Sequence, residues 1–255
     1  MSSSHGSFAW YDLMTSDTGA AQAFYGPVVG WNAHDASQPG APYTLLLAGE
    51  TQVAGVMPMH EAAGGAKPVW RGYVEVDDVD ASADRVATLG GSVHRPPADI
   101  PHVGRFAVVA DPQGAIFLLF KGSAAMTLPP AVPDKPGYVA WRELMAGDGE
   151  AAFTFYAALF GWTKAEAIDM GPMGTYQLYA CRGDTIGGMM TKPPGVPAPF
   201  WTYYFQVDGI EAAIGRLKSG GGTVTNGPHQ VPGGQWIVQG LDPQGGMFAL
   251  VSWNK

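Results

Sequence analysis

The sequence predicts an α+β protein in which four βαβββ units form two cup-shaped, mixed eight-stranded sheets with helices outside. The first observation is a repeat: residues 137–162 resemble residues 7–31, and Trp141 and Trp162 each follow their counterparts Trp10 and Trp31 by 131 residues. The second is that a strand–helix–strand pattern occurs twice within each half. Because one helix cannot cover both faces of a four-stranded sheet, two adjacent units should share one curved sheet. Its concave face would be a natural ligand cavity.

The first unit begins with an expected strand at residues 8–13. Asp17 or Thr18 is expected to cap the helix that follows, because short polar side chains accept hydrogen bonds from free N–H groups at a helix start. Pro27 should shorten or kink this helix, and Gly30 should end it. Two short strands are expected at residues 43–48 and 52–57.

The second unit should begin with a strand at residues 70–76. Asp80 is the expected N-cap of a helix that runs to Leu89 and stops at Gly90. Three further strands are expected at residues 92–95, 105–110 and 116–120. Residues 111–114, Asp-Pro-Gln-Gly, have the composition of a tight turn, because proline fixes φ and glycine tolerates a positive φ.

The second half repeats this order, with a two-residue insertion before its third strand. Tyr43 and Met57 therefore align with Tyr176 and Met190, 133 residues later. Residues 122–136 are polar and rich in proline, which is typical of a linker. We therefore expect a first domain at residues 1–121, a linker at 122–136 and a second domain at 137–255.

Composition excludes several classes of function. The chain has 255 residues, 46% of them apolar, with a net charge of −8 and a pI of about 5.1, which argues against a nucleic-acid partner. No stretch of 18 apolar residues suggests a membrane span, and the N-terminus lacks the pattern of a secretory signal. Cys181 is the only cysteine, which favours a reducing, cytoplasmic location. The expected partner is a small molecule, with monomer and homodimer both open.

The repeated motifs identify a family resemblance. They are Leu13 with Phe24-Tyr25 and Gly30-Trp31, the stretch 73–79 (Tyr-Val-Glu-Val-Asp-Asp-Val) with Leu-Gly-Gly at 89–91, and the Asp-Pro-x-Gly turn before the last strand. Each occurs twice, in the same order. The chain resembles the vicinal oxygen chelate superfamily, which includes glyoxalase I, extradiol dioxygenases and bleomycin-resistance proteins.

The resemblance implies a site for a divalent metal held by His and Glu side chains from the first and last strands of each unit. In this sequence those positions are occupied by residues with unsuitable side chains: Trp10, Trp141, Arg71, Thr202, Leu118 and Ala249. Indole, guanidinium and aliphatic groups cannot form an octahedral N/O site. We therefore predict that the family's metal site is absent, and we expect no cofactor.

Side chains alternate along a strand, so residues two apart share a face. The expected ligand-binding residues are Trp10, Arg71, Tyr73 and Glu75 in the first sheet and Trp141, Thr202, Tyr204 and Gln206 in the second. Asp12 and Glu143 are candidate catalytic carboxylates. The first sheet has a cation beside its acids, whereas no basic residue aligns beside Glu143 in the second, and an acid in an aromatic cavity without a counter-charge can act as a general base. The same carboxylates could instead satisfy backbone donors at a strand end. Likewise, the aromatic rings could stack on a planar ligand or belong to the core.

Three functional hypotheses follow. The first is a metal-independent protein of the bleomycin-resistance type that binds an aromatic or apolar small molecule. The second is a cofactor-free lyase, isomerase or hydrolase that uses Glu143 or Asp12 as acid and base on a small carbonyl compound. The third, a metal-dependent glyoxalase or dioxygenase, is disfavoured by the side chains at the ligand positions.

Overall fold

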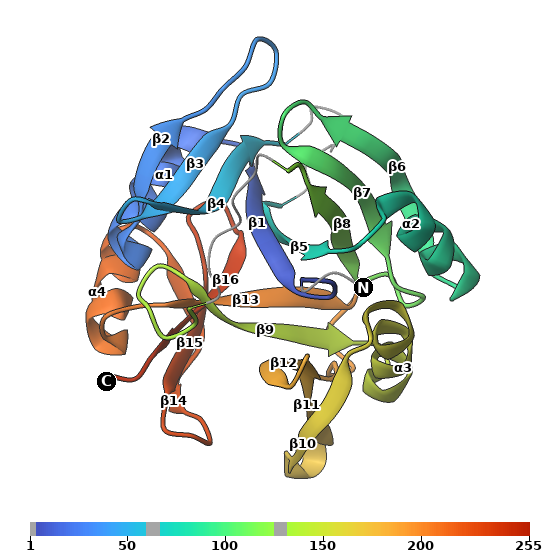
Figure 1. The fold of residues 1–255 in the computed structure, drawn as a ribbon. Helices are drawn as coiled ribbons and strands as arrows, with labels where there is room; N and C mark the ends of the chain where they lie inside the picture. Colours follow the sequence, from blue (N-terminus) through green and yellow to red (C-terminus); the bar gives the residue numbers. More distant parts are fainter. Residues whose placement is uncertain (1–3, 60–66, 125–131) are drawn as a thin grey trace. The chain divides into compact units, whose positions relative to one another are not determined.

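The computed structural model describes residues 4–59, 67–124 and 132–255. Its strands form two mixed eight-stranded sheets, as the sequence predicts (Figure 1). The strand order is β2-β3-β4-β1-β5-β8-β7-β6 in the first sheet and β10-β11-β12-β9-β13-β16-β15-β14 in the second. Each sheet is therefore built from consecutive strands of one sequence half. Parallel pairs, such as β1 with β4 and β5 with β8, occur beside antiparallel hairpins.

The first half contains β1 (Phe8–Thr15), α1 (Thr18–Tyr25), the π-helical segment η1 (Gly26–Gly30), β2 (Asn32–Asp35), β3 (Thr44–Ala48), β4 (Thr51–Pro58), β5 (Val69–Glu75), α2 (Val79–Thr88), β6 (Ser92–Ile100), β7 (Gly104–Ala110) and β8 (Ile116–Gly122). The second half contains β9 (Val139–Ala146), α3 (Gly149–Phe160), β10 (Thr163–Asp169), the 3-10 turn η3 (Gly171–Met173), β11 (Thr175–Cys181), β12 (Asp184–Thr191), β13 (Phe200–Gln206), α4 (Ile210–Ser219), β14 (Thr223–Gln230), β15 (Trp236–Leu241) and β16 (Met247–Ser252).

The helix starts confirm one expectation and correct another. Asp17 caps α1 by accepting a hydrogen bond from the N–H of Ala20 at 2.9 Å. The expected cap Asp80 is wrong: α2 is capped by Asp78, and Asp80 lies in its first turn, where it binds Arg105. Of the two aspartates, Asp78 has the extended backbone conformation that a cap needs.

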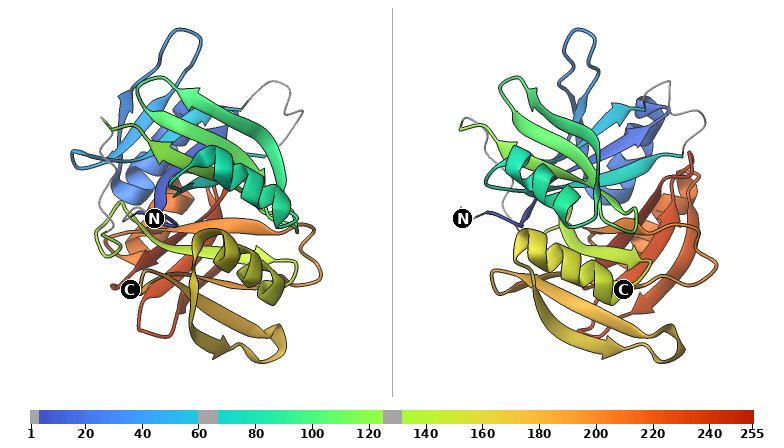
Figure 2. Two further views of the ribbon diagram at one scale, coloured as in Figure 1. Left: turned by 45° about the vertical axis from the view of Figure 1, so that its right-hand side comes forward. Right: turned by 90° about the vertical axis from the view of Figure 1, so that its right-hand side faces the viewer.

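The chain divides into two compact units, and each takes residues from both sequence halves. The first unit comprises Met1–Trp10, Arg71–Leu128 and Arg142–Trp201, and the second comprises Tyr11–Trp70, Pro129–Trp141 and Thr202–Lys255. Accordingly, α2 contacts α3 in the first unit, and η1 contacts α4 in the second (Figures 1 and 2). Residues 125–131 of the predicted linker lie outside the described part of the structure. The domain limits drawn from the sequence remain a prediction.

The repeated motifs connect the two halves inside each unit. In the first unit, Tyr156 of α3 donates a hydrogen bond to the turn residue Asp111, and Gln113 of the same turn binds the backbone of Asp148, the N-cap of α3. In the second unit, Tyr25 donates to Asp242, and Gln244 binds the backbone of Asp17. Each Asp-Pro-Gln-Gly turn thus holds the first helix of the other half.

The aromatic core of each unit lies between helix and sheet. Trp70 and Trp31 contact Phe205 and Tyr25 in the second unit. In the first unit, Trp162 and Tyr156 pack with Trp201. We call the sheet face that carries these rings the helix face and the opposite one the inner face. Trp70 and Trp201 are therefore core residues, the second of the two alternatives that the sequence left open for aromatic side chains.

Candidate functional site

Each predicted catalytic carboxylate is hydrogen-bonded to a tyrosine. The hydroxyl of Tyr43 donates to Asp12 Oδ1 at 2.7 Å in the second unit. The hydroxyl of Tyr176 donates to Glu143 Oε2 at 3.2 Å in the first unit. Both carboxylate residues are buried, at 4% and 7% exposure. The same acid–tyrosine pair therefore occurs in both copies of the repeat.

A glycine makes room for each tyrosine. Asp12 lies opposite Gly55 in the parallel pair β1–β4, and Glu143 lies opposite Gly188 in β9–β12. A Cβ atom at Gly188 would overlap the ring of Tyr176, and one at Gly55 would overlap Tyr43 and Asp12. Glycine is thus required at both positions because the phenol crosses directly over the backbone.

Sequence reasoning aligned the two tyrosines but did not place them in the site. Tyr43 and Tyr176 share the offset of 133 residues with Gly55 and Gly188. The signal available in the sequence was that a tyrosine and a strand glycine recur in both copies at the same spacing.

The predicted residues of the second sheet form a polar row on β13. Thr202, Tyr204 and Gln206 alternate with Trp201 and Phe205, whose rings lie on the helix face, so the three point to the inner face. Tyr204 accepts a hydrogen bond from Gln239 Nε2 at 2.7 Å. Thr202 Oγ1 and Gln206 Oε1 are buried and have no hydrogen-bond partner among the described residues.

The predicted residues of the first sheet have a different environment. Glu75, at the end of β5, is buried and lies 3.7 Å from Lys121 Nζ. Tyr73 contacts the ring of Phe120 edge-on, with the ring centroids 6.0 Å apart. Arg71 is half-buried on the same strand. This face therefore carries charged groups where the second sheet carries neutral ones.

The two tryptophans at the family's first-strand ligand positions also differ. Trp10 is buried. Trp141 is partly buried and packs against the inner-face cluster of Tyr204, Ala249 and Val251 in the second unit. The structure thus brings Trp141 together with one other predicted binding residue, Tyr204.

The predicted site residues are shared between the compact units. Asp12, Trp141, Thr202, Tyr204 and Gln206 belong to the second unit; Trp10, Arg71, Tyr73, Glu75 and Glu143 belong to the first. Within the units, the structure joins each carboxylate to a tyrosine, Glu75 to Lys121, and Trp141 to Tyr204.

The metal positions implied by the family resemblance can be tested by side-chain chemistry. Leu118 lies opposite Tyr73, and Ala249 lies opposite Tyr204, which places both aliphatic groups at the inner face of a last strand. Over residues 4–59, 67–124 and 132–255, no three His, Cys, Asp or Glu side chains cluster closely enough to hold a metal ion. The residues at these positions do not fit a divalent metal.

Two groups of the turn–helix contacts have shifted pKa values. Burial raises the pKa of Asp111, and hydrogen bonds from Ala115, Gln113 and Tyr156 oppose this shift. Burial, followed by the charge of Asp242, raises the pKa of Tyr25 well above its ordinary value, so its hydroxyl stays protonated and donates. These groups stabilise the turn–helix contacts.

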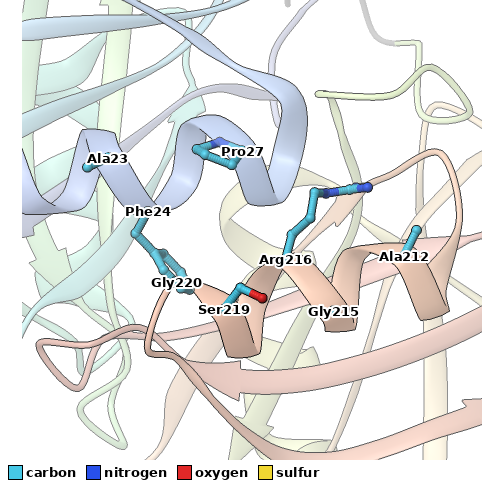
Figure 3. A pocket seen from close by; sticks show the side chains of 8 residues that line it. All are labelled: Ala23, Phe24, Pro27, Ala212, Gly215, Arg216, Ser219 and Gly220. Atoms are coloured by element: carbon cyan, nitrogen blue, oxygen red, sulfur yellow. The ribbon is translucent and has the colours of Figure 1, made fainter.

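A pocket of about 500 Å³ lies on the helix side of the second unit (Figure 3). Phe24 and Pro27 line one wall, and Arg216 and Ser219 of α4 line the other. Arg216 is held by Asp208 at 2.7 Å and by the carbonyl of Val28 at 3.3 Å. The pocket contains none of the predicted site residues, and its arginine serves the contact between η1 and α4.

In the described part of the chain, no helix has both the length and the apolar character needed to cross a bilayer.

Comparisons with known proteins agree with this fold. A family model described as the Glyoxalase/Bleomycin resistance protein/Dioxygenase superfamily matches residues 7–119 and again residues 136–250. "Putative glyoxylase CFP32" of Mycobacterium bovis is 34% identical over 247 residues, which cover 95% of this chain and 93% of that protein. "Anthracycline biosynthesis protein DnrV" of Streptomyces peucetius is 34% identical over 265 residues, covering 98% and 94% of the two chains.

Solved structures share the fold at low sequence identity. The 2,2',3-trihydroxybiphenyl 1,2-dioxygenase of Sphingomonas wittichii superposes with a TM-score of 0.70 at 14% identity, over 98% of this chain and 91% of that one. The Mn(II)-bound glyoxalase of Novosphingobium aromaticivorans gives a TM-score of 0.67 at 16% identity, over 98% and 83%. At these identities the likeness concerns the fold alone.

Proposed function

Because the chain belongs to the glyoxalase/bleomycin resistance protein/dioxygenase superfamily, we propose that it binds an aromatic or otherwise apolar small molecule on its inner sheet faces without a metal ion. The observation that carries the proposal is the chemistry at the family's ligand positions: Trp10 and Trp141, Arg71 and Thr202, and Leu118 and Ala249. The two tryptophans supply rings, Leu118 and Ala249 supply apolar surface, and the whole set lacks the His and Glu donors of a metal site.

The ligand class follows from the same residues. Tyr73, Tyr204 and Trp141 place aromatic rings along the inner-face strands, and rings of this kind stack on planar ligands. One relative is named for anthracycline biosynthesis, and anthracyclines are aromatic compounds, which supports an aromatic ligand.

The test uses 2-naphthol, a small planar aromatic probe, with tryptophan fluorescence as the readout. The protein is dialysed against EDTA, and its Zn, Ni, Fe and Mn contents are measured. We expect substoichiometric metal and the same quenching curve before and after chelation. Loss of 2-naphthol binding after chelation, with recovery on adding back one metal, would contradict the proposal.

A second candidate function is acid–base catalysis on a small carbonyl compound by Glu143 or Asp12. The specific observation in its favour is that each buried carboxylate is held by a tyrosine hydroxyl in both copies. A carboxylate fixed in this way can remove a proton from the carbon next to a carbonyl group. The tyrosine would hold the carboxylate in one orientation.

Deuterium exchange tests this activity without knowledge of the natural substrate. Hydroxyacetone in D₂O is followed by proton NMR with and without the protein. We expect faster exchange of the protons next to the carbonyl, and loss of this effect in Glu143→Gln or Asp12→Asn. Exchange that is unchanged in both variants would exclude the two carboxylates as the base.

A further inference from the structure

The two sheets differ in side-chain size at aligned inner-face positions. Tyr73 pairs with Leu118 in the first sheet just as Tyr204 pairs with Ala249 in the second. Phe120 and Phe106 are neighbours across β7 and β8, as Val251 and Ile237 are across β15 and β16. At each of the three positions the second sheet carries the smaller side chain: Leu118 becomes Ala249, Phe120 becomes Val251, and Phe106 becomes Ile237. At these three positions the second sheet therefore has less side-chain volume than the first.

The polar groups of the two sheets also differ. In the first sheet, Glu75 has a cation at 3.7 Å, the ammonium group of Lys121. The aligned residues of the second sheet are Gln206 and Ser252, which are both uncharged. Glu75 of the first sheet thus has an ion-pair partner, whereas Gln206 Oε1 of the second sheet has no hydrogen-bond partner among the described residues.

Two buried polar atoms on the inner face of β13 have no hydrogen-bond partner in the described structure. They are Thr202 Oγ1 and Gln206 Oε1, on residues that are 2% and 3% exposed. Buried polar atoms in folded proteins are nearly always hydrogen-bonded, to protein, water or ligand. Thr202 and Gln206 flank Tyr204 on the same face of β13. Two unpartnered acceptors on either side of an aromatic ring point to a bound molecule that supplies donors.

We propose that the inner face of β13 is the ligand subsite, and that it takes an uncharged, planar aromatic compound with a hydroxyl or N–H group. The donor would bind Gln206 Oε1 or Thr202 Oγ1, and the ring would lie against Tyr204 and Trp141. The row of Thr202, Tyr204, Gln206 and Gln239 carries no charge, so an ionised ligand would lose its hydration without compensation. This inference rests on the proposed binding function and assigns it to one of the two sheets.

The first experiment compares three probes on the unmodified, EDTA-treated protein by calorimetry. 2-Naphthol has the ring and the donor, 2-methoxynaphthalene has the ring without the donor, and 2-naphthoate has the ring with a negative charge. We expect 2-naphthol to bind about tenfold more tightly than its methyl ether, the ratio that one hydrogen bond to a buried acceptor supplies. The naphthoate should bind more weakly than both. Equal affinities, or tightest binding of the naphthoate, would overturn the proposal.

The second experiment removes the acceptors. Thr202→Val and Gln206→Met keep the approximate side-chain size, and together they should lower the affinity for 2-naphthol to that of 2-methoxynaphthalene. Ala249→Leu introduces the side chain of the first sheet and should block all three probes. Thr223→Val and Gln52→Met, at exposed positions of β14 and β4, are the matched controls and should bind like the unmodified protein.

The outcomes separate this inference from the proposed function. If none of the three probes binds the unmodified protein, the proposed function fails, and the inference fails with it. If 2-naphthol binds, and the double variant Thr202→Val with Gln206→Met still binds it more tightly than 2-methoxynaphthalene by the same factor, only the assignment to β13 is wrong. Circular dichroism of each variant establishes that it is folded, and the comparison of probes on the unmodified protein does not depend on the variants.

Discussion

At the scale of single residues, the acid–tyrosine pairs depend on glycines that sequence patterns alone do not explain. Gly188 lies on β12 opposite Glu143, and the ring of Tyr176 occupies the space where a Cβ atom would be. The arrangement repeats at Gly55 with Tyr43. A glycine in a strand weakens the strand, so its recurrence at both positions reflects the passage of the phenol.

We therefore predict that Gly188→Ala destabilises the protein by about 1–3 kcal/mol, because the added methyl group must displace the Tyr176 ring. Urea denaturation measures this cost. In a Tyr176→Ser background the same substitution should cost clearly less, because the ring is gone, and the double-mutant cycle gives the coupling. If the effects of Gly188→Ala and Tyr176→Ser simply add, the overlap between the new methyl group and the Tyr176 ring is relieved by movement of other parts of the structure.

The buried turn aspartate gives a prediction for pH. Burial raises the pKa of Asp111 in the folded protein, so the folded state binds its proton more tightly than the unfolded chain does. Its contribution to stability is therefore fully present below the unfolded pKa, about 4, and is lost as pH rises through the raised folded pKa. Relative to Asp111→Asn, the unmodified protein should lose unfolding free energy over this interval. Urea denaturation between pH 3.5 and 7 measures the difference.

Asp208 is the matched control, with the opposite sign. The hydrogen bond from Arg216 lowers the pKa of Asp208, so its contribution is present above the unfolded pKa and disappears as pH falls through the folded one. Because this pair is largely solvent-exposed, the effect should be small. If the effect of Asp111→Asn on the unfolding free energy changed with pH in the same direction as that of Asp208→Asn, the opposite pKa shifts assigned to the two aspartates would be contradicted.

At the scale of elements, the helices α1, α2, α3 and α4 start in unequal ways. Asp17, Asp78 and Asp148 cap α1, α2 and α3 through their side chains. The aligned residue of α4 is Gly209, which has the extended backbone of a cap but no side chain to accept a hydrogen bond. A Cβ at Gly209 would make only an ordinary contact, 3.6 Å from the carbonyl oxygen of Lys255.

Gly209→Asp should therefore stabilise the protein by about 0.5 kcal/mol, since an aspartate cap improves on glycine by a few tenths and also interacts favourably with the helix dipole. Thermal unfolding should show a small rise in Tm. The reciprocal change, Asp78→Gly, should lower it. A lower Tm for Gly209→Asp would mean that α4 does not accept the cap used by α2.

The sequence predicted elements well and the site less completely, for a physical reason. Strands, turns and the duplicated order depend on local patterns, and they appear close to the expected residues. The choice between Asp78 and Asp80 as cap depended on one backbone conformation that the pattern does not specify. The bond from Tyr43 to Asp12 spans 31 residues and depends on the register of three strands, so it could not be predicted from spacing.

At the scale of the whole molecule, sheets and compact units follow different divisions of the chain. Each sheet uses the strands of one sequence half, so each eight-stranded sheet that the sequence predicts lies within one repeat. Each compact unit joins segments of both halves. The buried contacts that cross between halves include the bond of Tyr156 to Asp111 and that of Tyr25 to Asp242. The duplicated turns are therefore part of how the halves hold together.

This arrangement predicts that neither half folds alone as a monomer. Residues 1–124 by themselves would expose Phe117, which packs on Phe155, Tyr156 and Phe160 in the complete chain. They would also lose the buried hydrogen bonds of Asp111 with Tyr156 and of Tyr25 with Asp242. Exposed aromatic core and lost buried hydrogen bonds are together enough to unfold a domain of this size. Near-UV circular dichroism should show no fixed aromatic environment in dilute residues 1–124.

Mixing that half with residues 132–255 should restore the near-UV signal and give a 1:1 complex in size-exclusion chromatography, because the complete set of contacts is then present. A concentration-dependent homodimer of residues 1–124 would agree with the same reasoning, since the repeats align and one copy can stand in for the missing half. A monomeric half that unfolds cooperatively at low concentration would show instead that each sheet, with its own helices, is sufficient for a stable core.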